Sequence, residues 1–258
     1  MDKIHLTDDE LLYLSNLVKA KKVIGVSIPG NVYDASTIQR IKTKAESGLL
    51  EKGYLTLDFD GNRSPKPKVG QLVKASGDTW RLLQFSSMKR GTESTLYHLF
   101  SLRDQILMIR ENGEWIFGEA SLSDTYERIR LMIPSVQGSW GAKCEVFISS
   151  AEYERLKSGP DKAYADELAQ KYAWDDEHKG FCAEAGRILQ NVSQAFVYVN
   201  TDFNNSRVDQ HLSVVAADKL LRLSPEVQGS LDYVRILSMD PEDLEGEIEY
   251  LYGSSLDK

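Results

Sequence analysis

The sequence predicts an α+β fold made of two similar halves, each with helices, then an antiparallel meander of strands, then one helix. Strand-like segments follow one another through short turns instead of alternating with helices, which favours α+β over a doubly wound parallel sheet. The same order of elements occurs before and after a seam near residues 134–141, although sequence identity between the halves is negligible. We therefore expect halves 1–134 and 135–258 to form one compact unit around a central sheet, because either meander alone would leave an exposed edge.

Helix signals open the first half. Thr7 and Glu10 have the spacing of a capping box, and apolar residues then recur at helical spacing over residues 11–18. Residues 34–49 predict a second helix, with Asp34 as its N-cap. The apolar stripe of this second helix consists of Ile38, Ile41, Ala45 and Leu49.

Strands dominate the rest of the first half. A short strand is expected at 54–57, and a basic, proline-bearing loop at 62–68 leads into the meander. Two longer strands, 80–85 and 95–100, are predicted to be joined by a polar loop at 86–94.

A tight hairpin is the strongest local signal in the chain. Apolar segments at 106–110 and 114–117 flank Asn112-Gly113, the dipeptide that type I′ turns favour. A helix over 121–133 follows and is ended by Pro134.

The second half has a longer series of helices before its strands. Ser149 and Glu152 form a second capping box, Gly159 ends that helix, and Pro160 suits the first turn of the next one. A third apolar stripe runs over 181–192. Strands are expected at 194–200, 207–216, 220–223 and 231–237, and a last helix begins at Asp240-Pro241.

The charge of the chain is concentrated at one end. The 258 residues hold 31 Lys and Arg against 39 Asp and Glu, a net charge of −8. Residues 224–258 hold nine acids and two bases, so they carry −7 and leave −1 for the remainder. An acidic chain without a basic stripe argues against nucleic acid as a partner. The acids of the last helix fit either a surface for a basic partner or a solvated face beside a helix N-terminus.

The cell compartment is expected to be the cytoplasm. Cys144 and Cys182 are far apart and form no C-x-x-C motif, which fits a reducing compartment. The first ten residues are charged where a signal peptide would be apolar, and no apolar run approaches the ~18 residues of a membrane helix.

Catalytic and metal-binding motifs are not found, so the sequence predicts a protein that is not an enzyme and uses no cofactor or metal. A P-loop, a nucleophile elbow and an H-E-x-x-H motif are all missing. Residues 58–62 imitate the start of an EF-hand loop, but Arg63 and Val69 stand where glycine and glutamate are needed. His178 and Cys182 could face one way on a helix, yet no second pair completes a zinc site. The other histidines, His5, His98 and His211, are expected to be structural.

Two alternatives remain open from the residues. The helix at 34–49, the turn after it and the strand at 54–57 follow the order of a winged helix, and Arg40, Lys42 and Lys44 could contact phosphates. That order would make the protein a DNA-binding regulator. An enzyme with an unrecognised site is the remaining possibility.

Three segments resemble EspG-type proteins. They are residues 6–14, residues 45–54, and the meander from Trp80 to Ala120 with the helix that closes it. EspG proteins are cytosolic chaperones of type VII (ESX) secretion, and similar proteins accompany LXG-toxin loci. The resemblance implies two quasi-symmetric α+β halves around a central sheet. It also implies non-catalytic binding of a small helical secreted or toxin-associated protein.

The resemblance also implies a partner-binding surface. The family holds its partner with the sheet, a long hairpin loop and the C-terminal helices, and the matching loop here is 86–92. Tyr172 to Asp176 fits the export signal of a secreted substrate, but no W-x-G hairpin precedes it, so the adaptor interpretation is kept. The candidate partner-binding residues are Met88, Lys89, Arg90 and Gly91 of the loop, Trp174 and Phe181, and Glu242, Glu245 and Glu249 of the last helix.

Overall fold

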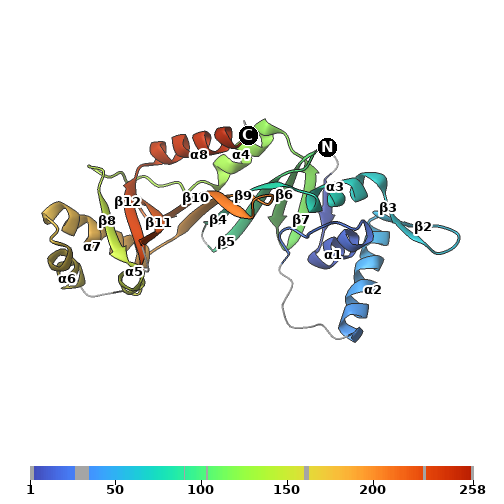
Figure 1. Cartoon of the computed structure of the whole chain (residues 1–258), viewed down its shortest axis with the longest axis horizontal. Helices are drawn as coiled ribbons and strands as arrows, with labels where there is room; N and C mark the ends of the chain where they lie inside the picture. The colour runs from blue at the N-terminus through green and yellow to red at the C-terminus, as the bar shows by residue number, and fades with distance from the viewer. Residues whose placement is uncertain are drawn as a thin grey trace. The chain divides into compact units, whose positions relative to one another are not determined.

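The computed structural model describes residues 3–26, 35–89, 91–102, 104–159, 163–228 and 231–256 (Figure 1). These residues form eight helices, one ten-stranded sheet and one two-stranded sheet. The α+β class predicted from the sequence is confirmed. Within the described part of the chain, the helices are too short or too polar to span a membrane.

The first half contains four helices and a four-stranded meander, preceded by one short strand. Its elements are β1 (Ile4–Leu6), α1 (Asp8–Leu17), α2 (Ala35–Glu51), β2 (Leu55–Leu57), β3 (Arg63–Pro65), α3 (Pro67–Gly77), β4 (Arg81–Lys89), β5 (Thr92–Phe100), β6 (Gln105–Glu111), β7 (Glu114–Glu119) and α4 (Leu122–Met132). The β2–β3 hairpin is the separate two-stranded sheet.

The second half repeats this order with its own short strand in front. Its elements are β8 (Glu145–Ser149), α5 (Ser150–Lys157), α6 (Ala163–Tyr172), α7 (Asp176–Gln190), β9 (Gln194–Asp202), β10 (Arg207–Ala216), β11 (Leu220–Gln228), β12 (Leu231–Met239) and α8 (Pro241–Leu256).

The strand order of the large sheet reflects the repeat. It runs β1-β7-β6-β5-β4-β9-β10-β11-β12-β8, so the two meanders join in one sheet, as expected from their edges. In each half the short first strand pairs antiparallel with the last strand of the meander. Ile4 lies opposite Phe117 in β1–β7, and Ile148 lies opposite Val234 in β12–β8.

The contacts divide the chain into two compact units that each draw on several segments. The first unit comprises Met1–Gln84, Ser94–Glu127 and Asn200–Asp209, and the second comprises Phe85–Glu93, Arg128–Val199 and Gln210–Lys258. The boundary at residue 134 between two sequence halves stays a prediction. We describe each unit by itself below.

The core of the first unit surrounds Trp115, which is 1% exposed. Its indole N–H donates to a carboxylate oxygen of Asp8 at 2.7 Å, and the Arg110 guanidinium lies 4.8 Å from the ring centroid. Gly25 passes close to this ring with φ +81°, and a Cβ there would lie 2.5 Å from the indole. A glycine is therefore needed at residue 25 for both conformation and space.

The second unit contains two groups of buried aromatic and aliphatic side chains. One lies between α5, α6, α7 and the strands, and includes Leu168, Phe181 and Ile188. The other brings Phe85 of β4 within 5.0 Å of Tyr198 and 6.0 Å of Tyr252 of α8, measured between ring centroids.

Several local predictions are confirmed. Thr7 with Glu10 and Ser149 with Glu152 form complete capping boxes at α1 and α5. Asn112 and Gly113 have φ of 52° and 83°, as a type I′ turn requires. The N-cap expected at Asp34 and the first-turn proline expected at Pro160 lie outside the described residues.

Other local predictions are wrong, and each error has a physical reason. The loop expected at 62–68 contains β3 and the start of α3, a helix that begins with Pro67 at its first turn. The polar loop expected at 86–94 is mostly strand, because β4 continues to Lys89 and β5 begins at Thr92. By contrast, the interpretation of residues 58–62 as an ordinary turn and not an EF-hand loop is correct, because the Asp58 carboxylate accepts from the N–H groups of Asp60 and Asn62 in a hairpin turn.

Candidate functional site

The tip of the β4–β5 hairpin carries the loop residues proposed to bind a partner. Met88 and Lys89 are half-buried at the end of β4, and Gly91 precedes β5 with φ +79°. Arg90 lies outside the described residues. The long hairpin loop expected here is therefore short, because β4 continues to Lys89 and β5 begins at Thr92.

This hairpin donates hydrogen bonds to the last carbonyl groups of α4. The Lys89 ammonium donates to the Leu131 carbonyl at 2.8 Å, and the Ser87 hydroxyl donates to the Met132 carbonyl at 2.9 Å. These carbonyls have no partner within the helix, and a cation there complements the helix dipole. Burial lowers the pKa of Lys89 below its ordinary value. The Leu131 side chain is 78% exposed.

The acidic helix α8 is tied to the same end of α4. Glu245 pairs with Arg130 at 2.8 Å, and Arg130 directly precedes Leu131. Two further acids also have partners in the second unit: Asp243 pairs with Lys143 at 2.9 Å and Glu247 with Arg222 at 2.6 Å. Glu242 and Glu249 have exposed side chains.

These contacts connect two of the segments proposed to bind a partner, the β4–β5 hairpin and α8, through the C-terminal end of α4. We name the set Lys89, Arg130, Leu131 and Glu245 the α4–α8 surface. Met88 alternates with Ser87 and Lys89 along β4 and therefore points to the opposite face of the sheet. The α4–α8 surface combines an exposed leucine with charges of both signs. Exposed aliphatic side chains rimmed by charge are typical of a protein-binding surface.

Trp174 and Phe181 belong to the core around α6 and α7. Phe181 is 5% exposed and packs edge-on against Trp140 at 5.0 Å between centroids. Trp174 is half-buried and stacks on Tyr172 at 5.3 Å. The expectation that Phe181 offers its side chain to a partner is corrected by this burial, and its apolar helical spacing already favoured the core.

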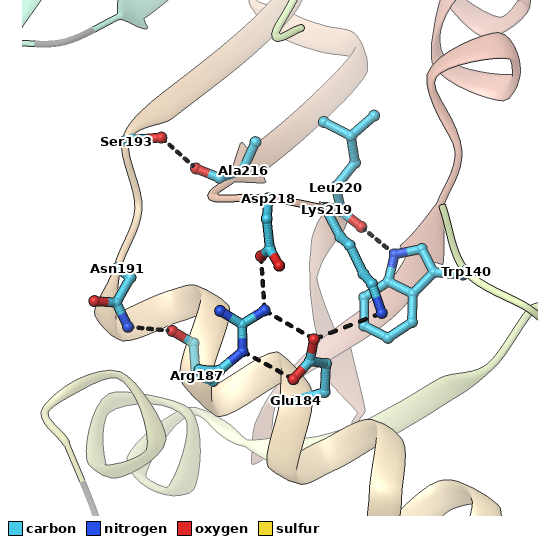
Figure 2. A network of polar contacts seen from close by, with 9 residues as sticks. All are labelled: Trp140, Glu184, Arg187, Asn191, Ser193, Ala216, Asp218, Lys219 and Leu220. Atoms are coloured by element: carbon cyan, nitrogen blue, oxygen red, sulfur yellow. Dashed lines mark hydrogen bonds and ion pairs between the residues drawn. The ribbon is translucent and has the colours of Figure 1, made fainter. Parts of the chain in front are cut away.

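A polar network joins α7 to the β10–β11 turn (Figure 2). The Arg187 guanidinium donates to Glu184 at 2.8 Å and to Asp218 at 2.6 Å, and Lys219 lies 3.6 Å from Glu184. Both carboxyl pKa values are lowered, first of all by the hydrogen bond from Arg187. The network therefore holds the helix that carries Phe181 in place.

Trp140 extends this network toward the segment before β8. Its indole N–H donates to the Leu220 carbonyl at 2.8 Å, and the Lys219 ammonium lies 4.6 Å from the ring centroid (Figure 2). Gly138 approaches the same turn so closely that a Cβ would lie 2.6 Å from the Asp218 carbonyl oxygen. The predicted seam at 134–141 is therefore packed within the second unit, against the β10–β11 turn.

The first unit contains a groove that sequence reasoning did not identify. It lies between α1 and α2, has a volume of about 470 Å³, and is walled by apolar side chains. The lining residues are Asp9, Leu12, Tyr13, Asn16, Leu17, Ile38, Ile41, Lys42 and Arg63. A second hollow of about 650 Å³ lies between the start of α1 and the other side of α2. The stripe of Ile38 and Ile41 was visible in the sequence, but its incomplete coverage was not.

The described residues offer little reactive chemistry. Among them, no three His, Cys, Asp or Glu side chains gather as metal ligands. Cys144 and Cys182 are free thiols, and burial raises the pKa of Cys182 to about 12, which disfavours the nucleophilic thiolate. His98 is fully buried, and this burial lowers its pKa to about 4 although Gln105 bonds its ring.

Comparison with known proteins identifies the fold. No family model matches the sequence, and no curated protein matches it. Among solved structures, the chain is similar to the type VII secretion system chaperone EspG5 of Mycobacterium tuberculosis in its complex with a PE25–PPE41 dimer. The TM-score is 0.60 at 12% sequence identity, and the match covers 95% of this chain and 93% of EspG5. The resemblance drawn from the sequence is thus confirmed at the level of the fold: this chain has an EspG-like α+β fold.

Proposed function

We propose that this protein is a non-catalytic cytosolic chaperone or adaptor that holds a helical substrate of a type VII secretion system. The observation that carries the proposal is the fold match, which extends over nearly the whole of both chains. The matching protein is itself a type VII secretion system chaperone in complex with a PE25–PPE41 dimer. A fold can host several functions, so the proposal also needs a surface on this chain that fits the role.

The α4–α8 surface is the docking surface in this proposal. Leu131, which is 78% exposed, supplies the apolar centre for a partner helix on this surface. Met88 lies on the other face of β4, where its flexible thioether is a separate candidate contact. Glu242, Glu245 and Glu249 form an acidic border along α8, and Gly91 lies at the hairpin tip. Arg90 is included in the proposal from its place in the sequence. Trp174 and Phe181 support the surface by packing α6 and α7, without touching the partner.

A pull-down with a matched pair of variants tests the proposal. The full chain is co-expressed with the small helical proteins encoded beside it, and complexes are isolated through a tag. Leu131→Asp should weaken retention at least tenfold, because a charge replaces the exposed apolar centre. Leu102→Asp is the control, since Leu102 is 94% exposed and belongs to the first unit.

Two results would contradict the proposal. Failure to retain any of the helical proteins would remove the chaperone function. An equal effect of the two variants would remove the α4–α8 surface from it.

A further inference from the structure

Helix α2 buries far less of its apolar stripe than a structural helix does. Of its seventeen residues, only Ala45 and Leu49 are buried. Ile41 is half-buried and Ile38 is 54% exposed, although both continue the same helical stripe. The C-terminal half of α2 thus packs on the first unit, while its N-terminal half presents isoleucines to solvent.

The exposed isoleucines form one wall of a groove. The opposite wall is α1, through Leu12, Tyr13 and Leu17, all of them half-buried. We name this the α1–α2 groove. Its volume of about 470 Å³ lies within the range of about 300–1,000 Å³ found for binding pockets.

The groove is preformed, because polar contacts fix its two walls. The Tyr13 hydroxyl donates to the Glu46 carboxylate at 3.5 Å, and Arg63 bonds the other oxygen of the same carboxylate. At the far end of α2, the Lys52 ammonium donates to Glu10 of α1 at 2.8 Å. Binding therefore does not lose conformational entropy through ordering of the two walls.

The charged side chains on the exposed half of α2 are all cationic. Residues 35–44 contain Arg40, Lys42 and Lys44 and no acid, within a chain whose net charge is −8. Lys42 lines the groove, whereas Arg40 and Lys44 line the hollow on the other side of α2. Asp9 lines both, and Glu46 is neutralised by Arg63. The exposed half of α2 is thus an apolar strip between cations.

We propose that the α1–α2 groove docks an acidic amphipathic helix of a partner protein. Two helical walls accept a third helix through apolar residues at i, i+4 and i+7. Carboxylates beside those anchors would face Arg40, Lys42 and Lys44, whereas a basic helix would be repelled. The groove lies in the first unit and the α4–α8 surface in the second, so this proposal does not rest on the proposed function.

The first test uses three labelled synthetic helices and fluorescence anisotropy with the full chain. One helix has leucines at i, i+4 and i+7 with glutamates elsewhere, one has lysines in place of the glutamates, and one has the glutamates with alanines in place of the leucines. We expect the first helix to bind at least tenfold more tightly than either of the others. Binding that is equal for all three, or missing for the first at 100 μM protein, overturns the proposal.

Variants then locate the site. Ile38→Asp with Ile41→Asp should weaken binding of the acidic leucine helix at least tenfold and leave the urea midpoint nearly unchanged, since these side chains are partly exposed. Leu102→Asp should leave the affinity within twofold, and Leu131→Asp likewise. Loss of binding in Leu131→Asp but not in the isoleucine variant would place the helix on the other surface.

Two further experiments test whether DNA or a second copy of the chain binds at this site instead of a partner helix. If a DNA duplex binds α2, as a winged-helix protein would, Arg40→Glu with Lys44→Glu should abolish DNA binding while the isoleucine variant keeps it. If a second copy occupies the groove, the isoleucine variant should convert a dimer to a monomer in sedimentation. Either result overturns the proposal in favour of that occupant.

Discussion

The first two helices of each half share the same polar contacts but differ in how much of the second helix is buried. In both halves a short edge strand leads into a capping box, and a lysine near the end of the next helix binds its glutamate. Lys52 lies 2.8 Å from Glu10, and Lys171 lies 2.6 Å from Glu152. Yet α6 buries four of its ten residues, whereas α2 buries two of seventeen.

The difference shows which part of α2 the fold requires. In the second half, α6 is covered by α7, and Tyr172 adds a further hydrogen bond to Glu152. Burial opposes the charge of Glu152, but the bonds from Lys171, Tyr172 and Ser149 together hold its pKa at about 2. In the first half, the lysine contact and the burial of Ala45 and Leu49 occur only at the C-terminal end of α2. The exposed start of α2 is therefore not explained by stability, which favours a role in binding.

The largest expected effect separates the two helices directly. Leu168→Ala in α6 should lower the free energy of unfolding by about 2–5 kcal/mol, because a side chain only 2% exposed is removed from the core. Ile38→Ala in α2 should change it by less than about 0.5 kcal/mol. Urea unfolding followed by far-UV circular dichroism measures both. Similar losses of unfolding free energy in the two variants would show that the start of α2 is structural. That result would contradict the difference drawn between α2 and α6.

Much of this contrast could be predicted from the sequence, but its decisive part could not. Capping boxes and apolar stripes are local, so Thr7, Ser149 and the stripe of α2 were identified correctly. Whether Ile38 is covered depends on the path of distant segments, which periodicity does not encode. The same holds for β1 and β8, because strands of three and five residues are stabilised by partners more than 80 residues away.

The candidate site shows the same limit. The loop expected at 86–94 is polar, yet its residues extend a hairpin because Ser87 and Lys89 find partners on α4. The acids of α8 were visible as a charge cluster, but their ion pairs with Arg130, Lys143 and Arg222 depend on tertiary structure. Residue chemistry thus identified the segments, and packing decided which side chains remain exposed.

A second comparison concerns the loss of stability at acidic pH. Each half places one histidine on the second strand of its meander: His98 in β5 is fully buried, and His211 in β10 is exposed. Burial lowers the pKa of His98 from 6.5 to about 4. The unfolded chain therefore binds a proton at this residue below pH 6.5, and the folded chain does so only near pH 4. Stability is lost as the pH falls through this window, by about 2–3 kcal/mol.

Variants at the two histidines assign that loss to one half. Urea midpoints are measured at pH 7 and pH 4.5 for His98→Gln and His211→Gln. The pH-dependent loss should shrink strongly in His98→Gln and persist in His211→Gln, where burial and Arg222 lower the pKa as well but the side chain is exposed. A loss of the same size in both variants would place the acid sensitivity elsewhere.

The smallest expected effect tests what the halves share. Thr7→Ala and Ser149→Ala each remove the hydroxyl that accepts from the backbone N–H of Glu10 or Glu152. Each should cost about 1 kcal/mol of unfolding free energy, since an N-cap has a similar worth in either half. Urea unfolding of both variants, with Ser158→Ala as an exposed control, provides the comparison. A larger cost for Ser149→Ala is the informative deviation. The Ser149 hydroxyl also donates to the Glu152 carboxylate at 2.7 Å, so an excess would show that the capping box also stabilises the Lys171 and Tyr172 contacts that hold α6 in place.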